Sequence, residues 1–142
     1  MMFALLALQS ALACGPYGGY AESDDGAWAY EDEDSIVLFS ADGDRAELPL
    51  YGDVTAMKFV GEELVVAYFG QEGSLAILFD GAGDEAAEWS PLFGKRVISD
   101  IQVLRQGMIF NMDLDGSPSR VRLTDDLMPA ENLDVPRGML WR

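Results

Sequence analysis

The body of the chain consists of short runs rich in valine, isoleucine, leucine, phenylalanine and tyrosine, separated by glycine and aspartate. No stretch carries the 3.6-residue apolar period that an amphipathic helix requires. Short β-prone runs bounded by turn-forming residues are typical of strands in an all-β domain. We therefore predict an antiparallel meander of hairpins with about ten or eleven strands. The expected strands are 27–30, 35–40, 45–50, 54–60, 63–69, 74–80, 86–90, 97–104, 107–114 and 119–124, with 138–141 as the eleventh.

Three of the expected hairpins share one plan, in which an apolar residue, four turn residues and a serine follow one another. They begin at Tyr30, Phe69 and Leu114, and the tetrapeptides "PLYG" (49–52) and "PLFG" (91–94) follow the first two. Four strands per roughly 40–45 residues is the period of a β-propeller blade. The repeats therefore resemble a degenerate propeller-type unit, of the WD-repeat or quinoprotein-like kind.

The length of the chain leaves the arrangement of these hairpins open. A closed propeller takes at least about four blades, and this chain has room for about two and a half. Three architectures remain: an open stack of meander sheets, a β-sandwich, and a propeller completed by several chains. We expect a sandwich or an open, partial-propeller-like meander within one chain. The runs 63–69 and 74–80 are apolar on both faces, so we expect them to be central and covered on both sides.

Acidic side chains dominate the N-terminal half of the chain. Residues 20–90 hold 18 acidic side chains against two basic ones, Arg45 and Lys58, whereas 91–142 hold seven of each sign and the net charge is −16. A field of this sign repels phosphates and anionic membranes, so we expect no nucleic-acid binding. The acidity suits a cationic or basic partner, or solubility in a salty or extracellular setting.

The residue types needed for common catalytic sites are missing. The chain has no histidine and one cysteine, which excludes Ser-His-Asp and Cys-His hydrolases, internal disulfides and cysteine-based zinc sites in this chain alone. We expect a protein that is not an enzyme and binds no cofactor. The alternative in this class is a carboxylate-based hydrolase of envelope glycans, which needs two carboxylates ~5–10 Å apart in a cleft.

The first residues have the pattern of an export signal. An apolar run at 2–8 ends in Ala11-Leu12-Ala13, an A-x-A cleavage pattern, and it is too short to span a bilayer. The stretch "ALAC" resembles a bacterial lipobox, although the family places leucine three residues before the cysteine and here Ala11 has that position. The resemblance implies lipid attachment at Cys14. Ordinary secretion with a free thiol at Cys14 is the alternative.

These features divide the chain into a signal segment (1–13), a flexible tether rich in glycine and acids (14–26) and an all-β domain (27–142). We expect an exported protein, either an outer-membrane lipoprotein or periplasmic protein, or an extracellular one. A lipid on Cys14 would be its only contact with the membrane.

One stretch has the letters of a calcium loop. Residues 111–116 read NMDLDG, which fits the start of the pattern D-x-[DN]-x-[DN]-G. The weak candidate ligands are Asn111, Asp113 and Asp115. The same letters describe a half-buried strand followed by a turn at 115–118, which would place Asp113 opposite Arg120 and Asn111 opposite Arg122. We favour this hairpin and predict no metal site.

The remaining candidate groups favour structural roles. Four consecutive acids at 31–34 are expected to form a solvated turn. Large aromatic side chains are expected to pack in the core or at edges and not to form a sugar-binding platform; they are Trp28, Tyr30, Tyr51, Trp89 and Phe93. The predicted function is a non-catalytic binding or scaffold module of the cell envelope or extracellular space, with a protein or polysaccharide partner. The alternative is an accessory subunit that completes a propeller by oligomerisation.

Overall fold

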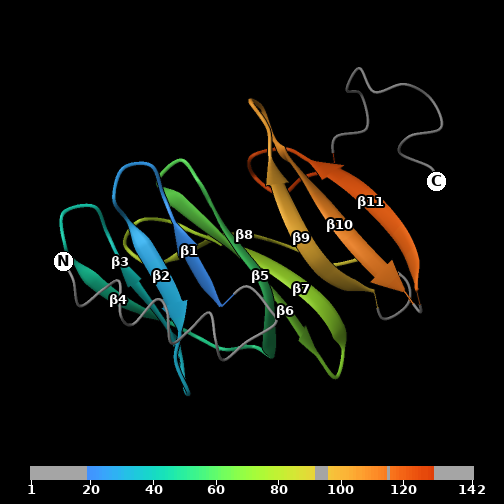
Figure 1. The fold of residues 1–142 in the computed structure, drawn as a ribbon, viewed down its shortest axis with the longest axis horizontal. Helices are drawn as coiled ribbons and strands as arrows, with labels where there is room; N and C mark the ends of the chain where they lie inside the picture. The colour runs from blue at the N-terminus through green and yellow to red at the C-terminus, as the bar shows by residue number, and fades with distance from the viewer. Residues whose placement is uncertain (1–18, 92–95, 115, 130–142) are drawn as a thin grey trace.

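The computed structural model describes residues 19–91, 96–114 and 116–129 (Figure 1). These residues form strands and turns, with no helix among them, so the described part of the chain holds no helix able to cross a membrane. The strands are β1 (Tyr20–Glu22), β2 (Trp28–Glu31), β3 (Ile36–Phe39), β4 (Arg45–Leu48), β5 (Asp53–Val60), β6 (Glu63–Gly70), β7 (Gly73–Phe79), β8 (Glu85–Trp89), β9 (Val97–Val103), β10 (Met108–Leu114) and β11 (Ser117–Leu123).

The strands form three antiparallel meanders in which neighbours along the chain are neighbours in the sheet. Sheet A contains β1 to β4, sheet B contains β5 to β8 and sheet C contains β9 to β11. The predicted all-β class is therefore confirmed. The three hairpins that share one sequence plan are β2–β3, β6–β7 and β10–β11, which are the second and third strands of their sheets.

Sheet B lies between the other two sheets (Figure 1). The first strands of the sheets contact one another, β1 with β5 and β5 with β9. The arrangement is therefore an open stack of three sheets that approach most closely along β1, β5 and β9. Short connections join the sheets, and the first of them is Pro49–Gly52 between β4 and β5.

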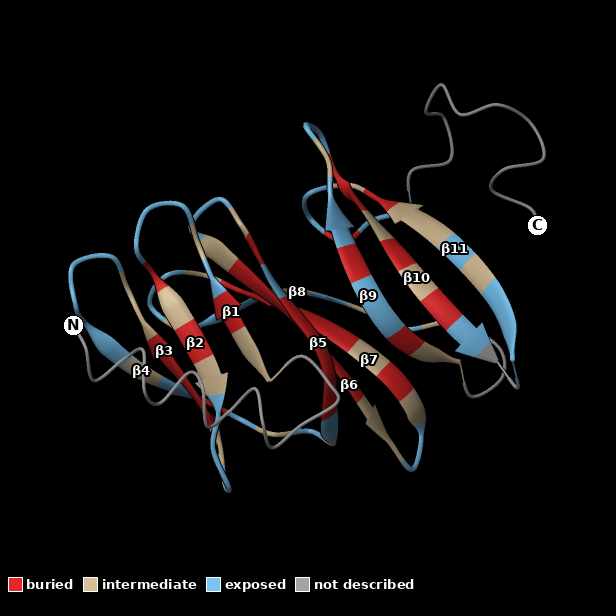
Figure 2. Cartoon of the chain, viewed as in Figure 1, coloured by how far each residue is buried: buried red, intermediate tan, exposed pale blue. Residues whose placement is uncertain are grey.

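Two apolar cores hold the stack together, one on each face of sheet B (Figure 2). Leu78 and Phe79 are consecutive in β7 and point to opposite faces, and both are at most 1% exposed. All residues from Leu64 to Tyr68 in β6 are buried as well. The prediction that these two runs are covered on both sides is therefore confirmed.

The predicted tether is wrong at residues 20–22, which form β1. Ala21 pairs with Ala29 of β2 and is buried in the core between sheets A and B. The Ser23 hydroxyl accepts a hydrogen bond from the Ala27 amide at 3.0 Å and closes the connecting turn. Three strand residues among glycines and acids are too few to show alternation, so pairing with β2 decides their conformation. Residues 1–18, Cys14 among them, lie outside the described part.

The predicted register of the β10–β11 hairpin is also wrong, by two residues. Leu114 pairs with Ser117, so two residues connect the strands where we predicted four, and Asn111 lies opposite Arg120. Asp113 lies opposite Pro118. Gly116 has a φ of +84°, as tight two-residue hairpin turns require. A shift of two residues keeps every side chain on its predicted face, because side-chain direction has a period of two.

Candidate functional site

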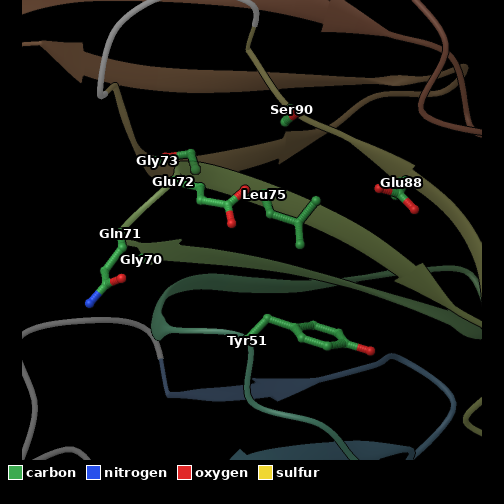
Figure 3. A pocket seen from close by; sticks show the side chains of 9 residues that line it. Tyr51, Gly70, Gln71, Glu72, Gly73, Leu75, Glu88 and Ser90 are labelled. Carbon is green, nitrogen blue, oxygen red and sulfur yellow. The ribbon is translucent and has the colours of Figure 1, made fainter.

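A hollow of about 580 Å³ opens beside the β6–β7 hairpin (Figure 3). In Figure 3 the Leu75 side chain lies between the carboxylates of Glu72 and Glu88, and the Tyr51 ring faces them from the connection between sheets A and B. Leu75 is partly buried and packs against the core between sheets A and B, so the hollow adjoins the outer edge of that core. Its lining residues are Tyr51, Gly70, Gln71, Glu72, Gly73, Ser74, Leu75, Glu88 and Ser90.

The Tyr51 ring is held at both ends and still faces solvent. It packs against Tyr68 in a T-shaped arrangement, with ring centroids 5.5 Å apart and planes at 77°. Its hydroxyl donates a hydrogen bond of 2.6 Å to Oε2 of Glu85 on β8. With 48% of the residue exposed, Tyr51 is one of the few large apolar surfaces open to solvent among the described residues. The ring therefore forms a rigid aromatic wall of the hollow.

The electrostatic environment of the hollow is negative. Glu72 and Glu88 are both exposed, and the lining includes no basic residue. The hydrogen bond to Glu85 raises the pKa of the Tyr51 hydroxyl above its ordinary value, with further contributions from desolvation and from the charges of Glu85 and Glu88. The hollow thus combines an exposed aromatic ring with carboxylates and offers a favourable environment for a cation.

A second notable surface is the outer face of sheet A, which points away from sheet B. The inward residues of this sheet belong to the core, so alternation places the aromatic residues of β1 to β3 outward. The Trp28 ring stacks on Phe39 at 4.7 Å and on Tyr30 at 5.5 Å, and it lies 6.4 Å from Tyr20. All four rings are only partly buried. Trp28 and Tyr30 therefore lie on an interior strand with their rings on the outer face, so the predicted packing in the core or at an edge is wrong for these two residues.

The outer face of sheet C is polar, and it carries the residues of the candidate calcium loop. The Asn111 amide donates to Oε1 of Gln102 at 3.2 Å, and Nη2 of Arg120 donates to the same oxygen at 3.2 Å. Asp113 is exposed and accepts a bond of 3.4 Å from the Gly116 amide. Asp115 lies outside the described residues.

The favoured hairpin at 111–116 is therefore present as β10 and β11. Within the described ranges, no three acidic, histidine or cysteine side chains come together as metal ligands. Of the four acids expected in a solvated turn, residues 32–34 lie in the turn and Glu31 ends β2; all four are exposed, and the Glu33 amide donates to Oδ1 of Asp32 at 2.8 Å. Trp89 packs edge-on against Phe110 at the border of the second core, while Phe93 lies outside the described part.

Sequence reasoning did not find the hollow. Its aromatic wall comes from a connection between sheets, and its acids come from a hairpin turn and an edge strand far away along the chain. The only available signal was the tyrosine in the repeated "PLYG" tetrapeptide. No family model, curated protein or solved structure matches this chain. The geometry of the described residues is therefore the basis for any proposed function.

Proposed function

We propose that this chain is a non-catalytic binding module whose hollow accepts an arginine or lysine side chain of a partner protein. The observation that carries the proposal is that the exposed Tyr51 ring lines the same hollow as the carboxylates of Glu72 and Glu88, and that this lining has no basic residue. A guanidinium group is attracted to the face of an aromatic ring and forms charge-assisted hydrogen bonds with carboxylates.

The charge of the whole chain supports a basic partner. The hollow lies within residues 20–90, where 18 acidic side chains face two basic ones. Such a field raises the rate of encounter with a positively charged segment and repels acidic competitors. The interaction should weaken as salt is added, because the carboxylates are exposed and screened.

The exposure of the acids favours binding over hydrolysis. General acid/base pairs work in clefts that exclude water, with one carboxyl group held protonated by its surroundings. Glu72 and Glu88 are instead open to solvent. As part of the same proposal, the module acts in the cell envelope or outside the cell, and this part rests on the signal pattern that ends at Ala13, just before Cys14.

Isothermal titration calorimetry with two short peptides tests the proposal. One is acetyl-Gly-Arg-Gly-amide, and the other replaces arginine by citrulline, which keeps the shape and removes the charge. We expect the arginine peptide to bind at least about tenfold more tightly, with affinity that falls between 50 and 300 mM salt. Equal affinity for the two peptides would refute the proposal.

Three variants locate the binding site. Tyr51→Ala removes the ring and Glu88→Gln removes one charge, so each should reduce affinity for the arginine peptide by about threefold or more. Glu33→Gln removes an equally exposed charge in the β2–β3 turn and should leave affinity unchanged. An equal loss in all three variants would indicate a general charge effect and not this hollow.

A further inference from the structure

The stack of three sheets has two ends that no other described sheet covers. Sheet B is covered on both faces, whereas sheets A and C are each covered on one. The outer face of sheet A corresponds in position to the face of sheet B that packs against sheet A. A sheet C from a second copy, placed against it, would therefore continue the order A, B, C, A, B, C.

The outer face of sheet A has an aromatic centre and charged edges. Register places Tyr20, Tyr30, Val37 and Glu47 in one row across the strands, and Glu22, Trp28, Phe39 and Arg45 in the next. Arg45 pairs with Glu47 at 2.8 Å at the β4 edge. Val37 is already fully buried in the single chain, so a partner would meet the four adjacent half-buried rings, and aromatic residues are enriched at interfaces.

The outer face of sheet C presents groups that suit aromatic rings. Register places Gln102, Ile109 and Arg122 in one row, Asp100, Asn111 and Arg120 in the next, and Val97, Asp113 and Pro118 in a third, so the face carries two arginines and two aspartates. Nε of Arg122 is buried and has no hydrogen-bond partner among the described residues. This atom is already covered within the chain, so a docked surface would meet the exposed Arg120 side chain and the accessible part of the half-buried Arg122 side chain.

We infer that the outer face of sheet A of one copy docks against the outer face of sheet C of a second copy, and that two copies close into a ring of six sheets. The guanidinium groups of Arg120 and Arg122 would face the aromatic rings and the acids Glu22 and Glu47. Arg45 would face Asp100. Contact between two A faces would instead bring two acidic halves together, which electrostatic repulsion disfavours.

The number of sheets favours two copies. Contacts between two different faces produce a closed ring when the rotation from one copy to the next is a whole fraction of 360°. Otherwise they produce a helical filament. Rings of sheets in propellers contain about four to eight members. The described residues of one chain form three sheets, so two copies fall in this range and three copies exceed it. This inference goes beyond the proposed hollow and does not depend on it.

Sedimentation equilibrium of the full chain tests the stoichiometry. We expect a species of twice the 15.5 kDa chain mass at micromolar concentration. A monomer at all concentrations up to about 1 mM, as would follow if another protein covers the aromatic face, refutes the inference. Trimers, tetramers or filaments refute it as well.

Charge-reversal variants identify the faces. Trp28→Glu disables the A face and Arg120→Glu disables the C face, and each alone should weaken dimerisation at least about tenfold. Met128→Glu is the control, because this apolar residue is 61% exposed and lies outside both faces. It should leave the dimer intact. Circular dichroism verifies folding, and Arg120→Glu, at an exposed side chain, carries the test if Trp28→Glu unfolds the chain.

A mixing experiment separates docking of unlike faces from docking of like faces. The Trp28→Glu chain keeps a working C face, and the Arg120→Glu chain keeps a working A face. Mixed together, they should form a heterodimer through one intact interface, although each alone is mostly monomeric. A dimer of the Arg120→Glu chain as stable as the original would show that two A faces meet and would overturn the inference.

Discussion

The hydroxyl of Tyr68 donates a hydrogen bond of 2.7 Å to the carbonyl oxygen of Pro49, joining the core of sheet B to the connection that follows sheet A. Tyr68 is 1% exposed, and burial raises the pKa of its hydroxyl well above the ordinary value. This contact positions the connection that carries Tyr51, and therefore one wall of the hollow.

Removing this hydroxyl should destabilise the fold. We expect Tyr68→Phe to lower the free energy of unfolding by about 1–2 kcal/mol, because the Pro49 carbonyl loses its donor at a partly buried site. Tyr51→Phe removes an exposed hydrogen bond from a neighbouring ring and should cost no more than about 0.5 kcal/mol. Urea denaturation of both variants measures the difference. Equal losses would show that burial of the Tyr68 bond contributes nothing.

Gly52 occupies a position that no other residue fits. Its φ is +155°, and a Cβ there would lie 2.6 Å from the carbonyl oxygen of Phe69. We expect Gly52→Ala to cost on the order of 2–4 kcal/mol, because the backbone of β6 cannot move away without loss of pairing. Gly81→Ala is the matched control, since its nearest heavy atom outside the chain neighbours is 3.9 Å away. Thermal melting should show Gly81→Ala within about 1 kcal/mol of the original.

Replacing either of two consecutive residues should lower the free energy of unfolding by similar amounts in sheet B and by very different amounts in sheet A. Leu78 and Phe79 fill different cores, so we expect Leu78→Ala to cost about 2–5 kcal/mol and Phe79→Ala about 3–5 kcal/mol. In β4, Leu48 is fully buried and Glu47 is exposed. Leu48→Ala should therefore cost about 2–5 kcal/mol and Glu47→Ala about 0.5 kcal/mol or less. A mild effect of either sheet B variant would contradict the coverage of both its faces.

The protein should become less stable as pH rises from 4.5 to neutrality. Burial and the charges of Asp126, Asp80 and Asp125 raise the pKa of Glu63 above its ordinary 4.5. The folded state then holds protons that the unfolded state has released, so stability is present below the unfolded pKa and is lost as pH rises through the folded pKa. Burial and the charge of Asp53 raise the pKa of Glu31 in the same direction.

Glu63→Gln isolates this effect. The variant should be more stable than the original at pH 7, by less than about 1 kcal/mol because the group is largely solvated. The gain should largely disappear at pH 4, where glutamate is mostly protonated in both states. Urea midpoints at the two pH values measure it, and a gain that persists at pH 4 would point to packing in place of charge.

Calcium should leave thermal stability unchanged. The Asn111 amide is engaged by Gln102, and the positive Arg120 lies on the same face beside it. We therefore expect a melting temperature shift of less than about 1 °C on adding 5 mM CaCl₂ or excess chelator. A rise of several degrees that Asp113→Ala abolishes would establish a calcium site here.

The strands were predictable because their signals are local. Alternation of apolar and polar residues and the glycines between runs place most strand ends within one or two residues of those observed. The register of β10 and β11 was not predictable in the same way. A two-residue turn and a four-residue turn both keep Asn111 on the same face, so the apolar pattern is compatible with either register. The observed pairing of Leu114 with Ser117 decides between the two registers.

The hollow depends on residues that meet only in three dimensions. Tyr51 carries no signal in its own neighbourhood, and its ring acquires a role when Tyr68 and Glu85 hold it against the edge of sheet B. The outward aromatic cluster was hidden for a related reason. A half-buried tryptophan such as Trp28 is easily assigned to the core from sequence alone, because the side of the strand on which the neighbouring sheet lies is not known.

The sequence by itself determined the all-β class and the central place of sheet B, because β6 and β7 are apolar on both faces and every such face must be buried. Only the tertiary structure decided that β1 exists, which strand positions pair, and which faces of sheets A and C no other described sheet covers. Those outcomes depend on contacts between residues far apart in the chain, and a pattern with a period of two cannot specify such contacts.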